Sequence, residues 1–278
     1  PETLEGPAPV VVALHGCLQD AATYARESGW NELADQYGFR VLYPEQVNTN
    51  HPNRCFSWFQ DEDINRDQGE AASIAQMVQY LDDLALLDEE QVYVTGLSAG
   101  GCMTAVMLAT YPERFTAGAV MAGIPYKAST SVEHALSAMR GEVDQSSEQW
   151  DALVREQNPD YEGTYPRLAI FHGLEDEVVS RQNMDELVEQ WTHLHDIREL
   201  QVQEEIGFAD NPNVTRKTYY DADHRAVVMT YEVAEMGHAL AVNPGAGPQQ
   251  GGATGQFAVD VDFFYSYWAA AFFGLLNP

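Results

Sequence analysis

Apolar residues recur along this chain in short blocks that alternate with longer stretches of helical spacing. Six blocks rich in β-branched or aromatic residues predict strands, at 9–14, 39–43, 91–95, 117–121, 168–172 and 227–233. Apolar positions spaced for one helix face predict helices at 21–37, 69–86, 100–111, 181–195 and 258–273. Such alternation is typical of an α/β protein, with a mostly parallel central sheet and helices on both of its faces.

The length of 278 residues fits one α/β domain with a sizeable core. The sequence contains no repeat, polar linker or coiled-coil heptad, so we expect residues 1–278 to form a single domain. The apolar run at 263–276 contains a glycine and is too short to span a bilayer, which favours a packed terminal helix. The start carries no signal peptide, as expected for a mature secreted chain.

The stretch 91–102 predicts a strand, a sharp turn and the start of a helix. Its turn has the pattern Gly-x-Ser-x-Gly, with Ser98 between Gly96 and Gly100. Such a nucleophile elbow presents a serine hydroxyl beside a helix N-terminus, whose positive end favours developing negative charge. We therefore predict that Ser98 is a nucleophile. The alternative is that the two glycines only permit close packing and that Ser98 only caps the helix.

A serine nucleophile needs a base and an orienting carboxylate, which in this arrangement follow in the order Ser, Asp, His. The fifth predicted strand runs into a loop with Asp176, flanked by Glu175 and Glu177 as rival acids. The sixth predicted strand precedes a loop that contains His238. We predict a catalytic triad of Ser98, Asp176 and His238.

The other histidines are weaker bases for this task. His172 ends its predicted strand and is interpreted as a structural histidine. His193 and His195 lie in a helical stretch without a third ligand, and the acidic residues at 61–67 have poor spacing for calcium. We expect no metal.

The first predicted strand runs into His15, Gly16 and Cys17. A loop after an early strand commonly donates one backbone N–H to the oxyanion, and the residue after the nucleophile donates the other. The backbone amides of Cys17 and Ala99 are therefore the predicted oxyanion hole. His15 is expected to brace this loop without touching substrate.

Further motifs are shared with one family of enzymes. They are His-Gly-Cys-Leu-Gln at 15–19, Gly-Phe-Arg-Val-Leu-Tyr-Pro-Glu-Gln at 38–46, Cys-Phe-Ser-Trp-Phe at 55–59, Gly-Glu-Ala-Ala-Ser-Ile at 69–74, Gly-Leu-Ser-Ala-Gly-Gly at 96–101, Ala-Gly-Ile-Pro-Tyr at 122–126 and Met-Gly-His at 236–238. With them the chain resembles the poly(3-hydroxybutyrate) depolymerase family, an α/β-hydrolase group that also contains feruloyl and acetylxylan esterases. The resemblance implies an α/β-hydrolase fold and ester hydrolysis without a cofactor. Relatives usually carry a further strand or two before residue 1, so a processed or trimmed chain is expected.

The resemblance also bears on the three cysteines and the aromatic residues. It points to a disulfide between Cys17 and Cys55, which leaves Cys102 as a small buried thiol. It places the Cys-x-x-Trp-Phe stretch beside the active site. Trp58 is the expected substrate contact, with Phe56 and Tyr126 as further ones; the alternative for each is core packing. Phe59 directly follows Trp58 in the same stretch.

The formal net charge is −29, from 43 acidic and 14 basic residues. Nucleic-acid binding is excluded because it requires a basic face that neutralises phosphates. Such a surface repels itself at low salt, which favours an enzyme of saline surroundings; the alternative is an acidic surface that serves only solubility. We expect no membrane partner, an ester polymer or oligomer as substrate, a monomer, and secretion.

The sequence thus predicts a secreted serine ester hydrolase of poly- or oligo-(3-hydroxybutyrate). A feruloyl or acetylxylan esterase of plant cell walls is the main alternative, and acyl transfer to an alcohol at the same site is a second. A catalytically inactive polymer-binding module is an alternative of another class, against which the complete triad argues.

Overall fold

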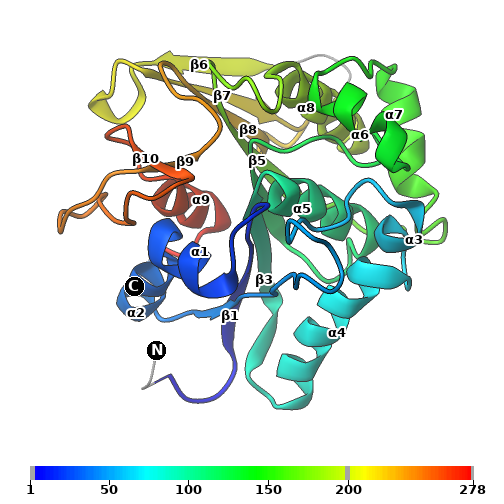
Figure 1. The fold of residues 1–278 in the computed structure, drawn as a ribbon, viewed down its shortest axis with the longest axis horizontal. Coiled ribbons are helices and arrows are strands. Elements are labelled where there is room, and N and C mark those ends of the chain that lie inside the picture. The colour runs from blue at the N-terminus through cyan, green and yellow to red at the C-terminus, as the bar shows by residue number, and fades with distance from the viewer. Residues whose placement is uncertain (1–3, 198–200, 277–278) are drawn as a thin grey trace.

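The computed structural model describes residues 4–197 and 201–276 (Figure 1). An eight-stranded sheet of order β2-β1-β3-β4-β5-β8-β7-β6 forms its centre. The strands of this sheet are β1 (Ala8–Leu14), β2 (Arg40–Leu42), β3 (Leu87–Leu97), β4 (Ala117–Met121), β5 (Arg167–Gly173), β6 (Val202–Ile206), β7 (Val214–Tyr220) and β8 (Ala226–Val233). Six of them pair in parallel, while β7 and β6 join antiparallel at one edge. The predicted mostly parallel sheet is confirmed.

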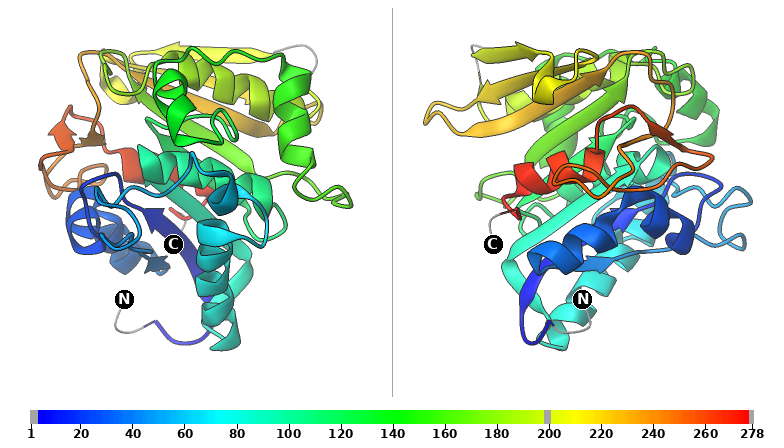
Figure 2. Two further views of the ribbon diagram at one scale, coloured as in Figure 1. Left: turned by 45° about the vertical axis from the view of Figure 1, so that its right-hand side comes forward. Right: turned by 90° about the vertical axis from the view of Figure 1, so that its left-hand side faces the viewer.

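Helices cover both faces of the sheet (Figures 1 and 2). One face carries α1 (Ala21–Ser28), α2 (Trp30–Tyr37) and α9 (Tyr265–Phe273). The other carries α3 (Asp61–Ile64), α4 (Gly69–Asp83), α5 (Ala99–Thr110), α6 (Val132–Met139), α7 (Ser147–Arg155) and α8 (Gln182–Leu194). Successive side chains of β1 alternate between two hydrophobic clusters, with Val10 and Val12 on one face and Val11 and Ala13 on the other. Burial on both faces explains why this strand is apolar throughout.

Two predicted helices differ from the observed ones. The stretch 21–37 is divided at Gly29, whose φ of +68° favours glycine and where a Cβ would lie 2.6 Å from the backbone nitrogen of Gly252. The stretch 258–273 becomes helical only at Tyr265, because β10 (Ala258–Asp260) pairs with β9 (Leu240–Val242) in a separate two-stranded sheet. Tertiary pairing has overridden local helical spacing there.

The sequence did not predict the strands β6 and β7 at one edge of the sheet or the helices between β4 and β5, whereas β2 at the other edge lies within the predicted strand 39–43. Strand β6 is mostly exposed and polar, so it lacks an apolar alternation, and its neighbour β7 places Arg216 2.7 Å from Glu205. Charged side chains of this kind protect a sheet edge from pairing with another chain. A short 3-10 turn, Phe208–Asp210, connects the two strands. Among the described helices, none has the length and apolarity needed to cross a bilayer.

The excess of acidic residues leads to a prediction about salt. Because 43 acidic residues face only 14 lysines and arginines, sodium chloride should raise the melting temperature by several degrees between millimolar and about 1 M, where the screening length falls to about 3 Å. Thermal unfolding followed by circular dichroism at pH 7 checks this. The same series near pH 4, where many carboxylates are protonated, is the control and should show a weaker rise. A flat curve at pH 7 would leave solubility as the role of the acidic surface.

Candidate active site

Ser98 stands at the turn from β3 to α5 with a strained backbone, φ 55° and ψ −119°. The turn is possible because its glycines allow main chains to touch: a Cβ at Gly96 would lie 2.4 Å from Gly100 C, and one at Gly100 would lie 2.2 Å from Leu14 O. The Ser98 amide donates to Met121 O at 2.9 Å, which ties the turn to β4. The sequence pattern therefore forms a nucleophile elbow, with the serine at the N-terminus of α5.

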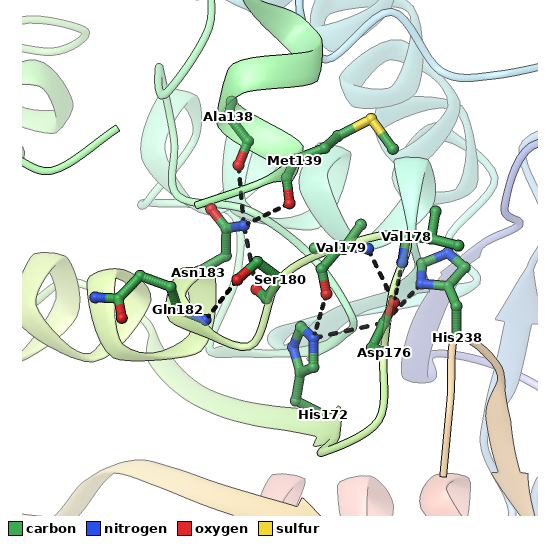
Figure 3. A network of polar contacts seen from close by, with 10 residues as sticks. All are labelled: Ala138, Met139, His172, Asp176, Val178, Val179, Ser180, Gln182, Asn183 and His238. Carbon is green, nitrogen blue, oxygen red and sulfur yellow. Dashed lines mark hydrogen bonds and ion pairs between the residues drawn. The ribbon is translucent and has the colours of Figure 1, made fainter. Parts of the chain in front are cut away.

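Asp176 and His238 follow the carboxyl ends of β5 and β8, and their side chains meet. His238 Nδ1 donates to Asp176 Oδ2 at 2.7 Å, while Asp176 Oδ1 accepts from the amides of Val178 at 2.8 Å and Val179 at 2.9 Å (Figure 3). Burial raises the pKa of Asp176, but the His238 contact and the two amides outweigh it and hold the pKa below its ordinary value. Asp176 is thus a carboxylate at neutral pH. The rival acids Glu175 and Glu177 are exposed.

The loops that carry Asp176 and His238 are joined through their main chains. The amide of Leu174 donates to Val233 O at 2.9 Å, and that of Glu175 donates to Met236 O at 2.9 Å. This approach requires Gly173, where a Cβ would lie 2.3 Å from Met236 O. Sequence reasoning missed Gly173, and only its place at the end of a strand before an acidic loop could have indicated it.

Ser98 and His238 both line one cavity of about 460 Å³ at the carboxyl edge of the parallel strands. In the described part of the chain the Ser98 hydroxyl makes no hydrogen bond to His238. Such bonds are often long in enzymes without substrate and shorten when substrate binds. The cavity is lined mainly by apolar side chains, namely Cys17, Leu18, Cys55, Trp58, Phe59, Leu97, Ala99, Cys102, Ile124, Val132, Ala135, Leu136, Met139, Val178, Val179 and Phe257, with Gly16, Gln19 and Asn53 beside them.

The loop after β1 is held from several directions. Gln19 Oε1 accepts from the Gly16 amide at 2.8 Å, His15 Nδ1 donates to Gly16 O at 2.8 Å, and the Gln46 amide donates to His15 Nε2 at 3.0 Å. Burial lowers the pKa of His15, so a neutral imidazole braces the loop, as the sequence predicts. Cys17 and Ala99, the predicted oxyanion donors, lie beside Ser98 in the cavity lining.

A disulfide connects this loop to the next one. Cys17 is bonded to Cys55, and Cys102 is a free buried thiol, so the predicted pairing is present in the structure. The two loops also share a hydrogen bond from the Leu18 amide to Asn53 O at 2.7 Å. An ion pair between Arg54 and Asp20 at 3.3 Å adds a third link.

The predicted aromatic contacts separate into two groups. Trp58 lines the cavity, with the Phe59 ring edge-on at 5.3 Å. Phe56 and Tyr126 are buried away from the cavity lining in the described residues, so the prediction that they contact substrate is corrected. Phe56 packs on the His15 ring at 5.0 Å, and the Tyr126 hydroxyl donates to Ile64 O at 2.9 Å. Both side chains are part of the hydrophobic core.

Helix α6 forms one wall of the cavity and was not predicted. Its C-terminal end is fixed to the acid loop by Asn183 Nδ2, which donates to Ala138 O at 3.0 Å, Met139 O at 3.3 Å and Ser180 O at 3.2 Å (Figure 3). The amide of Ser180 also donates to Met139 O at 2.7 Å. The wall of the cavity and the loop that carries Asp176 are thus part of one network.

Comparison with known proteins identifies the family. The family model described as esterase PHB depolymerase matches residues 2–205. Poly(3-hydroxyalkanoate) depolymerase C of Paucimonas lemoignei is 42% identical over 278 residues, which are all of this chain and 66% of that protein. The chain belongs to the PHB depolymerase esterase family.

Other members of this esterase family are similar over much of the chain. Feruloyl esterase B of Thermothelomyces thermophilus is 31% identical over 80% of this chain and 76% of its own length. The solved structure of an acetyl xylan esterase from Aspergillus awamori superposes with a TM-score of 0.76, at 28% identity and over 86% of both chains. The predicted α/β-hydrolase fold is thereby confirmed. The chain spans just under two thirds of the length of depolymerase C.

Proposed function

We propose that this chain is a secreted serine ester hydrolase in which Ser98, His238 and Asp176 form the catalytic triad. The observation that carries the proposal is the 2.7 Å contact between His238 and Asp176 at the cavity into which the Ser98 elbow opens. In the first half-reaction Ser98 Oγ attacks the ester carbonyl carbon while His238 Nε2 accepts the hydroxyl proton. Asp176 stays ionised and stabilises the imidazolium.

The remaining steps use the same groups. The backbone amides of Cys17 and Ala99 hold the oxyanion of the tetrahedral intermediate, and His238 returns its proton to the departing alcohol. An acyl ester on Ser98 remains. Water then attacks this ester while His238 takes a proton from the water. His238 returns this proton to Ser98 Oγ as the bond to the acyl group breaks, which releases the acid and restores both residues. No cofactor is needed for either half-reaction.

We propose poly- or oligo-(3-hydroxybutyrate) as the substrate class. The apolar cavity suits an uncharged aliphatic ester, since its lining contains no lysine, arginine, aspartate or glutamate among the described residues. The depolymerase with 42% identity over the whole chain supports the same class. A feruloyl ester is the second candidate, because the edge-on pair Trp58 and Phe59 could pack against a phenolic ring.

The mouth of the cavity carries exposed aliphatic side chains, which supports a polymeric substrate. Leu18, Val132, Leu136 and Val178 line the cavity and are 52%, 64%, 62% and 47% exposed. We name these four residues the apolar rim. On a chain of net charge −29, apolar side chains around the site offer a surface that a water-poor polyester can contact.

Substitution in the apolar rim should separate polymer hydrolysis from hydrolysis of a small ester. We expect Leu136→Ser to lower the rate on poly(3-hydroxybutyrate) particles several-fold and to leave p-nitrophenyl acetate turnover within about twofold, since burying a leucine side chain is worth about 1.5–3 kcal/mol. Ile206→Ser is the matched control, because Ile206 is an exposed aliphatic residue on the edge strand β6 and does not line the cavity. Equal losses on both substrates would contradict the role of the rim.

One side-by-side assay tests the proposed function and its alternatives. Acid release should be measured from poly(3-hydroxybutyrate) and its oligomers, methyl ferulate, acetylated xylan, an aromatic polyester and p-nitrophenyl acetate. Release from hydroxybutyrate oligomers supports the proposal, while cleavage of methyl ferulate alone would transfer the assignment to a feruloyl esterase. A chain that leaves even p-nitrophenyl acetate intact would be a binding module, and transfer products formed with added alcohol would indicate acyl transfer.

We propose further that the protein is exported and works as one monomeric catalytic domain. The Cys17–Cys55 disulfide supports an oxidising compartment. A net charge of −29 opposes self-association at low salt. Continuous coverage of one central sheet on both faces supports a single domain. Sedimentation at low and high salt would measure the oligomeric state.

A further inference from the structure

A second histidine, His172, lies beside the triad aspartate. It belongs to β5 and is fully buried, with 0% of its surface exposed. His172 Nε2 is 2.9 Å from Val179 O and 3.5 Å from Asp176 Oδ2, the oxygen that also accepts from His238. Figure 3 shows Asp176 between the two imidazole rings.

The neighbours of His172 determine which of its nitrogens carries the hydrogen. Val179 O is an acceptor only, and so is the ionised Asp176, so Nε2 must be the protonated nitrogen. Nδ1 is buried and has no hydrogen-bond partner in the described part of the chain. Burial lowers the pKa of His172 against the smaller raising effects of Val179 and Asp176. The ring is therefore neutral, with a fixed N–H on the side of the acid.

His172 reaches the carboxylate by two routes. Directly, its N–H lies beside Asp176 Oδ2. Indirectly, it holds the carbonyl of Val179, whose own amide donates to Asp176 Oδ1 at 2.9 Å. His172, which belongs to β5, therefore holds residues 176–179 in place around the Asp176 carboxylate.

We propose that His172 is a positioning residue that keeps Asp176 ionised and directed at His238 through the reaction. The proposal rests on the triad of the proposed function. When His238 becomes an imidazolium, Asp176 must remain a carboxylate. A neutral N–H beside it stabilises that negative charge without adding a competing positive one. Without it, more of the negative charge would face His238, and His238 would gain its proton at higher pH.

Other charged or protonatable groups also surround the His172 ring, and the three single substitutions of His172 leave them in place. His238 and Arg181 are the positive or protonatable neighbours that lower the pKa of His172. Glu232 is the register partner of His172 on β8 and is paired with Lys217 at 3.0 Å. Arg181 lies 3.6 Å from the same glutamate.

The test compares three substitutions of His172 on p-nitrophenyl acetate. His172→Leu fills a similar volume without a donor, His172→Gln carries an amide N–H near the position of Nε2, and His172→Asn carries one near Nδ1 only. We expect His172→Leu and His172→Asn to lower kcat about 10-fold with KM unchanged, because both remove the N–H that bonds to Val179 O and faces Asp176 Oδ2. The acid limb of the pH–rate profile should move to higher pH in both. His172→Gln should retain most of the wild-type rate, and its acid limb should lie near the wild-type pH.

A double substitution separates positioning from a general structural role. In a His238→Ala background, His172→Leu should not lower the residual rate further, because its effect passes through His238. A second 10-fold loss in that background, or a wild-type kcat and acid limb in both Leu and Asn, would overturn the proposal. If His172→Leu does not fold, the comparison of His172→Gln with His172→Asn tests the proposal by itself. Failure of the triad itself would appear separately, as activity retained by Ser98→Ala.

Discussion

Replacement of Ser98 by alanine should lower the rate of ester hydrolysis by about 10⁶-fold, the loss seen when a triad nucleophile is removed. The reason is that the covalent path is closed, and only the oxyanion hole and binding contribute to the residual rate. His238→Ala should cost nearly as much, and the double variant little more, because the two groups act as one unit. Initial rates on p-nitrophenyl acetate, with circular dichroism to verify folding, check this.

Controls for this prediction are available beside the elbow and on the acid loop. Cys102→Ala changes a buried residue in the first turn of α5 and should keep the rate within a few-fold. Asp176→Asn should cost on the order of 10⁴-fold, whereas Glu175→Gln and Glu177→Gln should cost little because both side chains are exposed. A tenth of wild-type activity in Ser98→Ala or His238→Ala would contradict the triad.

Removal of the Cys17–Cys55 disulfide should lower the free energy of unfolding by about 3–4 kcal/mol, since the bond closes a loop with a sequence separation of 38. It should also lower kcat on the order of 10-fold. Loss of a whole oxyanion donor costs about 10²–10³-fold, and here the Cys17 amide is displaced only partly. The bond from the Leu18 amide to Asn53 O and the ion pair of Arg54 with Asp20 limit the movement.

Denaturant unfolding and initial rates of the double variant Cys17→Ala/Cys55→Ala, against wild type, measure both effects. Cys102→Ala serves as the cysteine control, because that thiol is free. Peptide mapping that finds three free thiols, or Cys102 in the bridge, would refute the pairing. An unchanged kcat in a folded double variant would show that the disulfide stabilises the chain without positioning the oxyanion loop.

Features that depend on a few neighbouring residues could be predicted from the sequence. The apolar strand at 9–14 is buried on both faces, so its pattern is continuous and unambiguous. The elbow around Ser98 requires glycines at two fixed positions, because main-chain atoms come within 2.4 Å of where a Cβ would stand. Asp176 and His238 could be found because the carboxyl ends of parallel strands share one edge of a sheet.

Features that depend on which way a side chain points required the tertiary structure. Phe56 and Tyr126 lie in motifs next to the site, yet both turn into the core while Trp58 turns to the cavity. One short aromatic segment does not reveal which of its rings faces substrate. Gly173 likewise cannot be explained from its neighbours in sequence, because the backbone atoms that exclude a Cβ there belong to a loop more than sixty residues away in the chain.

The sequence by itself determined the parallel strands of the sheet, the elbow and the family, because each of these is encoded by local spacing and by residue types with few substitutes. Only the tertiary structure decided the apolar rim, which combines two residues of α6 with Leu18 and Val178 from two loops, and the place of His172 between Val179 and Asp176. Both result from packing between segments distant in sequence. Burial and hydrogen bonding there depend on atoms that no local pattern specifies.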